Sequence, residues 1–296
     1  MTHSNLPYYQ ESGNITPSRL LLGIAFIIAI SIILAYVYGL IMYYSPLVYI
    51  NAIICGAFGF ILGLAANFAG RLAHLRSLSW RIGFGVAAGI LGYLFHWSAY
   101  LPAVFNEGGV GPDIYLANAA MWTNPVNAFS SIQLLNTFGV WEIFGIANSG
   151  AFGAVVWLIE AAIIIGVPTY LAWGAKVHPY SESQGKYYDK YDVPDGYVGS
   201  IASPVSFIQA VQEDGFAPFE ALEPPKPRLQ YTFSVYFLEG ENHHYLDVNR
   251  VTVVTGDDGK VNTETNLVID NLTLTTETAK RVISELKAKK SALSMF

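Results

Sequence analysis

The sequence has little cysteine and little charge. Cys55 is the single cysteine in 296 residues, which excludes an intramolecular disulfide framework and a zinc site built from several cysteines. Charged residues make up 13% of the chain and hydrophobic residues 53%, whereas a soluble domain carries about 25% charged residues. The composition therefore predicts a membrane protein, with the lipid bilayer as its main environment.

Basic patches and catalytic motifs are also missing. The formal net charge is −6, so no basic footprint for nucleic acid is present. The sequence contains no P-loop, GxSxG, HExxH or dinucleotide fingerprint. His243 and His244 are adjacent in a predicted strand, and such residues point to opposite faces, which argues against a shared metal ion. We therefore expect a protein that is not an enzyme and needs no cofactor, metal or nucleic acid.

The charges that are present divide the chain near Lys176. Up to that residue, five basic and five acidic side chains cancel, and the remainder holds 11 Lys and Arg against 17 Asp and Glu. This asymmetry predicts an apolar membrane domain over residues 19–176 and an acidic, water-exposed part after it.

Long stretches without charge predict four membrane spans. The stretch between Arg19 and Arg71 carries no charged residue, which is too long for one span of about 20 residues and fits two. Pro46 separates them, following two tyrosines that favour the membrane interface. We expect the spans near residues 20–43, 48–70, 82–104 and 150–173.

The arginines predict the orientation of these spans. Arg71, Arg76 and Arg81 crowd the short link between the second and third spans, while the long link 105–149 contains no Lys or Arg. The positive-inside rule then places the 71–81 link in the cytoplasm and the 105–149 link outside. We expect a multi-pass protein of the plasma (bacterial inner) membrane, with the 1–18 tail and the C-terminus both cytoplasmic.

Two pairs of glycines predict close helix packing within the membrane. Gly59 and Gly63 form a GxxxG motif in the second span, and Gly85 and Gly89 have the same spacing in the third. Small residues at this spacing let helix backbones approach closely. The partner is either a neighbouring helix of the same chain or a second copy of the chain.

The external link contains a predicted amphipathic helix near residues 125–138. Asn124 and Pro125 suit its start and Gly139 its end. Apolar residues recur on one face of this segment, namely Val126, Phe129, Ile132 and Leu135. We expect it to lie on the outer membrane interface or, alternatively, to cover the bundle as a lid.

The C-terminal part predicts a tyrosine-rich tether over 177–200 and a small cytoplasmic α+β domain over 201–296. A helix begins at Ser203 and ends at Gly215, and a proline-rich connector follows over 219–228. Three strands are expected near 229–237, 244–255 and 262–274, with a bulge near Asn249 and a turn at Asp258-Gly259. A final helix closes the domain. The fold class is a membrane α-helical bundle of four transmembrane helices followed by this domain, ordered helix, three-stranded antiparallel meander, helix.

Two ionisable residues fall inside predicted spans, Glu160 in the fourth and His96 in the third. An ionisable group at membrane depth is costly and is a functional candidate by default. The alternative is a neutral, hydrogen-bonded glutamate that fixes the helix register. Because helical side chains lean toward the N-terminus of their own helix, we expect Glu160 and His96 to converge, with Tyr93 hydrogen-bonded to the carboxyl group.

The sequence favours a non-enzymatic membrane protein that anchors a cytoplasmic docking or assembly domain, as a subunit or accessory of a membrane complex. A protein partner is expected on the cytoplasmic domain, because the sheet edges permit strand addition. The alternative is a small transporter or channel that uses Glu160 and His96 and assembles as a homo-oligomer through the second and third spans.

Overall fold

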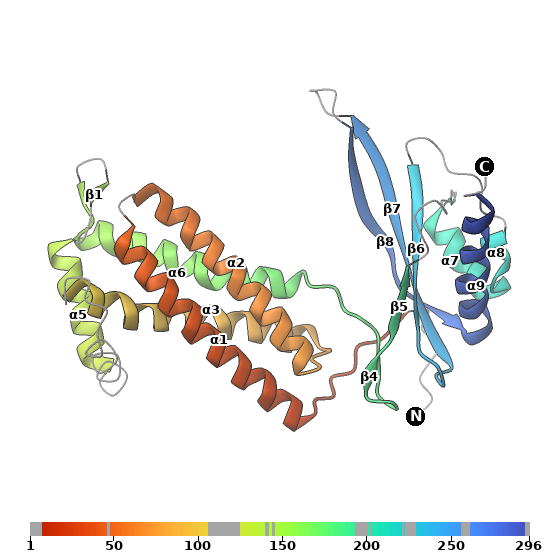
Figure 1. Cartoon of the computed structure of the whole chain (residues 1–296), viewed down its shortest axis with the longest axis horizontal. Helices are drawn as coiled ribbons and strands as arrows, with labels where there is room; N and C mark the ends of the chain where they lie inside the picture. Colours follow the sequence, from red (N-terminus) through yellow and green to blue (C-terminus); the bar gives the residue numbers. More distant parts are fainter. Residues whose placement is uncertain are drawn as a thin grey trace. The chain divides into compact units, whose positions relative to one another are not determined.

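The computed structural model describes residues 8–45, 48–105, 125–139, 142–143, 146–192, 201, 203–220, 222, 229–255 and 261–293. The chain divides into two compact units (Figure 1). The helical unit comprises Ser12–Lys176, and the sheet unit comprises Val177–Phe296 together with Met1–Glu11.

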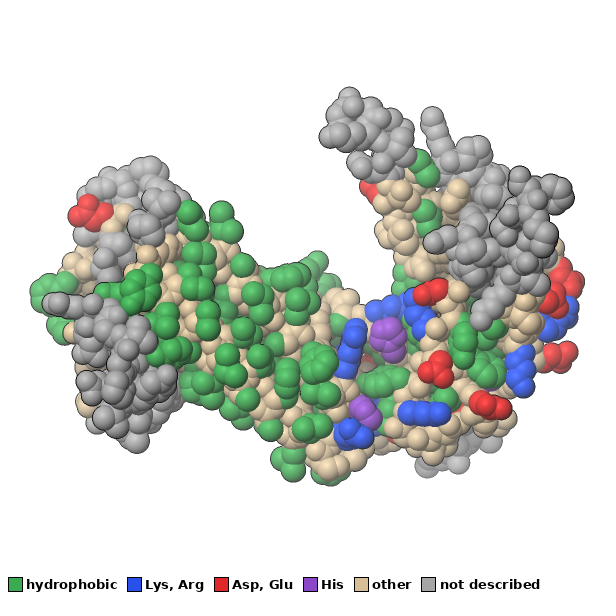
Figure 2. All heavy atoms as spheres, viewed as in Figure 1, with side chains coloured by type: hydrophobic (Ala, Val, Ile, Leu, Met, Phe, Trp, Pro, Cys, Tyr) green, Lys and Arg blue, Asp and Glu red, His purple; other side chains and the backbone are tan. Residues whose placement is uncertain are grey.

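Four helices of the helical unit are long and apolar enough to cross a membrane, counted over the described residues. They are α1 (Pro17–Tyr44), α2 (Val48–Leu72), α3 (Leu78–Phe105) and α6 (Gly150–Trp173). Hydrophobic side chains cover the visible face of this unit (Figure 2). The predicted arrangement of four long apolar helices followed by a small domain of helices and antiparallel strands is thus confirmed.

The basic residues near the α2–α3 link bind backbone carbonyl groups. Arg76 is 3% exposed and donates to the carbonyl of Asn14, just before α1. Arg81 donates through Nη1 to the carbonyl of Ala175, just after α6, at 2.5 Å. Burial, together with the nearby charges of Arg19 and Arg76, lowers the pKa of His74. The start of α1, the α2–α3 link and the end of α6 therefore meet at one end of the unit.

Both glycine pairs of the helical unit pack against α6. A Cβ atom added to Gly89 would lie 2.5 Å from Cα of Ile165, and one added to Gly63 would lie 3.1 Å from Cα of Pro168. Gly59 and Gly85 likewise face α6 backbone atoms. The helix that covers these glycines therefore belongs to the same chain, which favours the intramolecular interpretation.

The helix of the external link is present as α5 (Pro125–Phe138). Leu135 is buried and packs with Trp97 and Leu101 of α3, whereas Val126 and Phe129 are exposed. The apolar side chains thus do not all share one buried face. Asn124, the expected start of this helix, lies outside the described residues, and a short hairpin of β1 (Glu142–Ile143) and β2 (Ile146–Ala147) follows α5.

The main sheet of the second unit has one strand more than predicted. Within the described residues its order is β5-β6-β7-β8, all antiparallel, formed by β5 (Asp189–Asp192), β6 (Leu229–Phe237), β7 (His243–Thr255) and β8 (Val261–Thr275). The added strand, β5, comes from the segment expected to be a tether. Its four residues, Asp-Lys-Tyr-Asp, are too short and too polar to show an alternating apolar pattern.

The register of β7 and β8 shifts on either side of Val248, next to Asn249. The bulge predicted near Asn249 is therefore confirmed. The Asp258-Gly259 turn and prolines 224, 225 and 227 of the connector lie outside the described residues.

Helices cover one face of this sheet. They are α7 (Pro204–Asp214), α8 (Ala217–Glu220) and α9 (Thr276–Leu293), which lie together beside the sheet in Figure 1. Phe219 of α8 and Val282 of α9 are fully buried with Phe233 of β6 in one hydrophobic core. Gly215 ends α7 with φ of 61°, a conformation that favours glycine.

Residues just after Lys176 cover the opposite face of the sheet, and the N-terminal segment pairs with the edge of β8. Tyr188 joins Tyr236 and Leu238 in a second buried cluster, beside a hairpin of β3 (Tyr180–Ser181) and β4 (Lys186–Tyr187). Tyr8 forms a β-bridge with Leu272, and the backbone N–H of Tyr9 donates to the carbonyl of Asn271 at 2.9 Å. The N-terminal segment is therefore part of the sheet unit.

Candidate functional site

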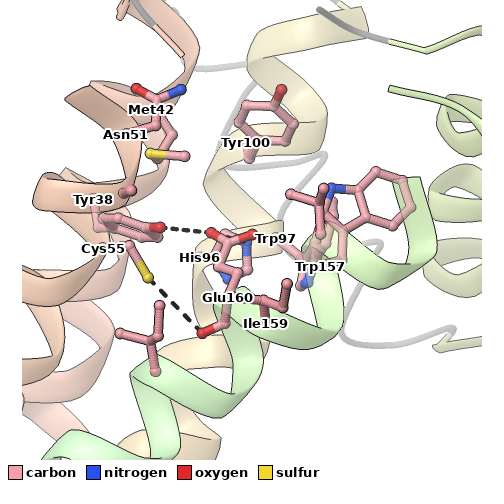
Figure 3. Close-up of a pocket in the computed structure, with 13 residues that line it drawn as sticks. Tyr38, Met42, Asn51, Cys55, His96, Trp97, Tyr100, Trp157, Ile159 and Glu160 are labelled. Atoms are coloured by element: carbon pink, nitrogen blue, oxygen red, sulfur yellow. Dashed lines mark hydrogen bonds and ion pairs between the residues drawn. The ribbon is translucent and has the colours of Figure 1, made fainter. Parts of the chain in front are cut away.

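The helical unit contains a cavity of about 260 Å³ that is lined by the ionisable residues singled out by the sequence (Figure 3). Its walls come from α1, α2, α3 and α6. The lining residues are Tyr38, Met42, Asn51, Ala52, Cys55, His96, Trp97, Tyr100, Val156, Trp157, Ile159, Glu160 and Ile163.

Glu160 is the central polar group of this cavity. It lies ten residues into α6, about 15 Å from the start of the helix at 1.5 Å per residue. Its Oε1 atom accepts a hydrogen bond of 2.5 Å from the hydroxyl group of Tyr38. The Tyr38 ring stacks on Phe58, with ring centroids 4.3 Å apart and planes at 4°. This stacking fixes the direction of the hydroxyl group that reaches the carboxyl.

His96 lies beside Glu160, so the structure brings the two sequence candidates together. His96 is 2% exposed, and its Nε2 atom is 3.9 Å from Oε1 of Glu160. That distance is too long for a hydrogen bond. Its Nδ1 atom lies 2.5 Å from the Tyr93 carbonyl, which can only accept, so Nδ1 is the donor. In a neutral imidazole, Nε2 is then an acceptor directed at the carboxyl group.

Tyr93 does not take the role expected from the sequence. Its hydroxyl group donates to the backbone carbonyl of Trp157 at 3.4 Å, and the side-chain donor to Glu160 is Tyr38. Tyr93 contacts α6 one turn before Glu160, so its hydroxyl group lies against the backbone of Trp157 and not against the carboxyl group. The only sequence signal for Tyr38 was a tyrosine inside an apolar run, which does not reveal the rotation of α1.

Asn51 and Cys55 of α2 complete the polar part of the cavity. Asn51 is 8% exposed, and its Oδ1 atom has no hydrogen-bond partner within the part of the chain that the structure describes. The Cys55 thiol is buried, with Sγ 3.8 Å from the Glu160 backbone carbonyl. Sequence reasoning missed Asn51, although an amide within a charge-free membrane stretch was a usable signal.

Aromatic rings form another wall. Trp97 packs edge-on against Trp157 with centroids 5.2 Å apart, and against Tyr100 at 6.0 Å. Among the described lining residues, Glu160 is the one acid, and none is Lys or Arg. The cavity is thus apolar and aromatic, with hydrogen-bond acceptors on a few atoms.

Of the two adjacent histidines in the sheet unit, His244 has a structural role. His243 is exposed and His244 buried. His244 Nδ1 accepts the N–H of Leu238 at 3.3 Å, and its ring stacks on Phe237 at 4.2 Å. Burial lowers the pKa of His244. Over the described residues, no group of three or more His, Cys, Asp and Glu side chains is placed to hold a metal ion.

The edge strand β8 is a second candidate surface. Residues 263–267 are all exposed, and Leu267 is 41% exposed. The Tyr8 bridge lies further along the same strand, at Leu272. The 263–267 stretch therefore offers edge backbone groups for pairing, and it ends at the exposed Leu267.

Comparison with known proteins assigns no function to the cavity or to the β8 edge, because no protein-family model, curated protein or solved structure matches this chain.

Proposed function

We propose that this chain is a multi-pass membrane protein that holds a docking domain at the cytoplasmic surface. Its four long apolar helices cross the bilayer, and the sheet unit binds a protein partner. The exposed 263–267 stretch of edge strand β8 is the observation that carries the docking function.

The number of spans is supported by the N-terminal segment. Tyr8 and Tyr9 precede α1 and bind the sheet unit through Leu272 and Asn271. The residues before the first span and after the last must then be on the same side of the membrane. That condition requires an even number of crossings, and four satisfies it. The Arg residues near the α2–α3 link favour the cytoplasm as this side.

The docking partner is a protein that adds a strand to the β8 edge. Edge strands offer unpaired backbone groups for this kind of binding, and pockets for alternate side chains give specificity. The part of the chain after Lys176 carries the whole net charge of −6. A strand flanked by basic residues complements that charge.

Co-purification in mild detergent tests the docking function. The pair Thr263→Lys and Thr265→Lys places charge on the proposed edge, a substitution that opposes strand addition. Ser284→Lys, on the exposed side of α9, is the matched control. We expect one protein to co-purify with wild type and Ser284→Lys and to be lost from the edge variant. Equal recovery of all proteins with the edge variant would contradict the proposal.

The polar cavity favours a second function, a small transporter or channel that uses Glu160 and His96. An ionisable pair at membrane depth is typical of such proteins. The glycines expected to join copies of the chain are covered by α6 of the same chain, so assembly would need another surface. A strictly monomeric mass in detergent would count against a pore.

A further inference from the structure

We propose that the cavity around Glu160 binds a lipophilic amine, with the protonated nitrogen at the carboxyl group and the apolar body against the aromatic wall. The proposal names a ligand for the second candidate function. It rests on the membrane-spanning helical unit and is independent of docking by the sheet unit.

Three of the residues that line the cavity contribute hydrogen-bond acceptors, namely Asn51, His96 and Glu160. Glu160 carries the carboxyl group, and His96 directs Nε2 toward it at 3.9 Å. Asn51 contributes Oδ1, which is buried without a hydrogen-bond partner in the described residues. A buried acceptor without a donor is costly, so the cavity is complementary to a ligand that donates hydrogen bonds. An ammonium group supplies up to three N–H donors.

The charge of the cavity selects a cation over a neutral donor. Glu160 is the acid of the lining, and the chain has no Lys or Arg between residues 82 and 175. A carboxylate in an apolar environment is stabilised by a close opposite charge. An amine that arrives neutral can take the proton of a neutral Glu160, which leaves the same ammonium–carboxylate pair.

The aromatic wall suits the same ligand. Trp97, Trp157 and Tyr100 line the cavity, and tryptophan faces attract cations most strongly among the aromatic side chains. In Figure 3, Asn51 and Tyr100 lie on opposite sides above the Glu160 carboxyl. A cavity of about 150 Å³ holds benzene, so about 260 Å³ accepts a larger apolar body.

The cavity reaches the surface of the bundle between α2 and α6. Ala52 of α2 is exposed, and Ile159 of α6 is 55% exposed, although both line the cavity. Glu160 lies about 15 Å along α6, near the middle of a hydrocarbon core about 30 Å thick. The opening therefore faces lipid tails, and a ligand that partitions into the bilayer can enter from the side.

Binding of a charged and a neutral ligand of the same shape tests this proposal. The full chain in lipid nanodiscs is titrated with 1-naphthylmethylamine and, separately, with 1-naphthalenemethanol, and empty nanodiscs give the background partitioning. We expect saturable binding of the amine at one site per chain, about tenfold tighter than the alcohol, since a charge-assisted hydrogen bond is worth roughly this factor. Equal binding of the two ligands, or amine uptake no greater than by empty nanodiscs, would overturn the proposal.

Two variants locate the binding. Glu160→Gln keeps an acceptor for Tyr38 and removes the charge, so the amine affinity should fall about tenfold. Glu142→Gln, at an exposed position of β1, is the matched control and should leave the amine affinity unchanged. Should Glu160→Gln not fold, Asn51→Leu provides the test, because it removes the orphan acceptor and should also weaken amine binding. Unchanged amine binding in the cavity variant that folds would overturn the assignment. A failure of docking is seen in the co-purification and leaves this result unaffected.

Discussion

Tyr38 is the residue that fixes Glu160 in the helical unit, and its hydroxyl group can be removed without changing the ring. Tyr38→Phe keeps the stacking on Phe58 and leaves the carboxyl without this donor. We expect the unfolding free energy to fall by about 1–3 kcal/mol, the cost of an unsatisfied buried acceptor. Thermal unfolding in detergent measures this change. Tyr170→Phe, at an exposed tyrosine of α6, serves as the control, and equal melting temperatures for both variants would contradict the role of Tyr38.

We expect His244 to make the stability of the sheet unit depend on pH. Its Nδ1 accepts the Leu238 N–H, so the neutral ring is the form that fits, and burial lowers its pKa. The unfolded value is about 6.5. Because the folded pKa is lower, this contribution is fully present above pH 6.5 and is lost as pH falls through the folded pKa.

We therefore expect a fragment of residues 177–296 to lose stability as pH falls from about 7 to 5. Urea unfolding at several pH values measures this loss. His244→Gln should reduce the slope, while His243→Gln, at the exposed neighbour, should retain it. The same slope in both variants would show that other groups cause the pH dependence.

Prediction of single residues from the sequence worked for residue types that are rare in membrane spans. Glu160 and His96 stand out as ionisable groups in apolar spans, and side-chain direction predicts their convergence. Tyr38 and Asn51 were missed because their role depends on how α1 and α2 rotate about their axes. That rotation is set by packing such as Gly39 against the His96 backbone, which no local pattern reports.

At the scale of elements, the close contact between α3 and α6 depends on glycine. An added Cβ at Gly89 would lie 2.5 Å from Ile165 Cα and 2.8 Å from the Ile164 carbonyl. Pro168 has no N–H to donate to the Ile164 carbonyl. Gly89 lets α3 lie directly against this carbonyl. Backbone atoms cannot move aside as a flexible side chain can.

Gly89→Ala should therefore destabilise the helical unit by about 1–3 kcal/mol, the usual cost of overpacking. Gly83→Ala on the same helix is the matched control, since an added Cβ there meets no atom within 4 Å. Thermal unfolding in detergent compares the two variants. A Gly89→Ala protein as stable as Gly83→Ala would mean that α3 and α6 are not this close.

The elements themselves were predictable where a pattern runs long. Charge-free stretches located the four apolar helices, and alternation located β6. The strand β5 was not predictable, because its Asp-Lys-Tyr-Asp sequence has the composition of a linker. It is ordered by pairing with β6 and by Ser234, which donates to Asp192 at 2.5 Å. Such pairing joins residues far apart in sequence and leaves no local signal.

At the scale of the whole molecule, the proposed function requires four crossings with both chain ends in the cytoplasm. The N-terminal segment binds the sheet unit, which requires an even number of crossings. The arginines near the α2–α3 link favour the cytoplasm as that side. The proposed docking at the cytoplasmic surface rests on this orientation.

Labelling of single cysteines in intact cells tests the orientation most directly. In a Cys55→Ser background, Glu142→Cys lies in the hairpin before α6 and Lys186→Cys lies in the sheet unit, both at exposed positions. A membrane-impermeant maleimide should label the Glu142→Cys protein in intact cells and the Lys186→Cys protein only after permeabilisation. Labelling of the Lys186→Cys protein in intact cells, with Glu142→Cys protected, would contradict the proposed orientation.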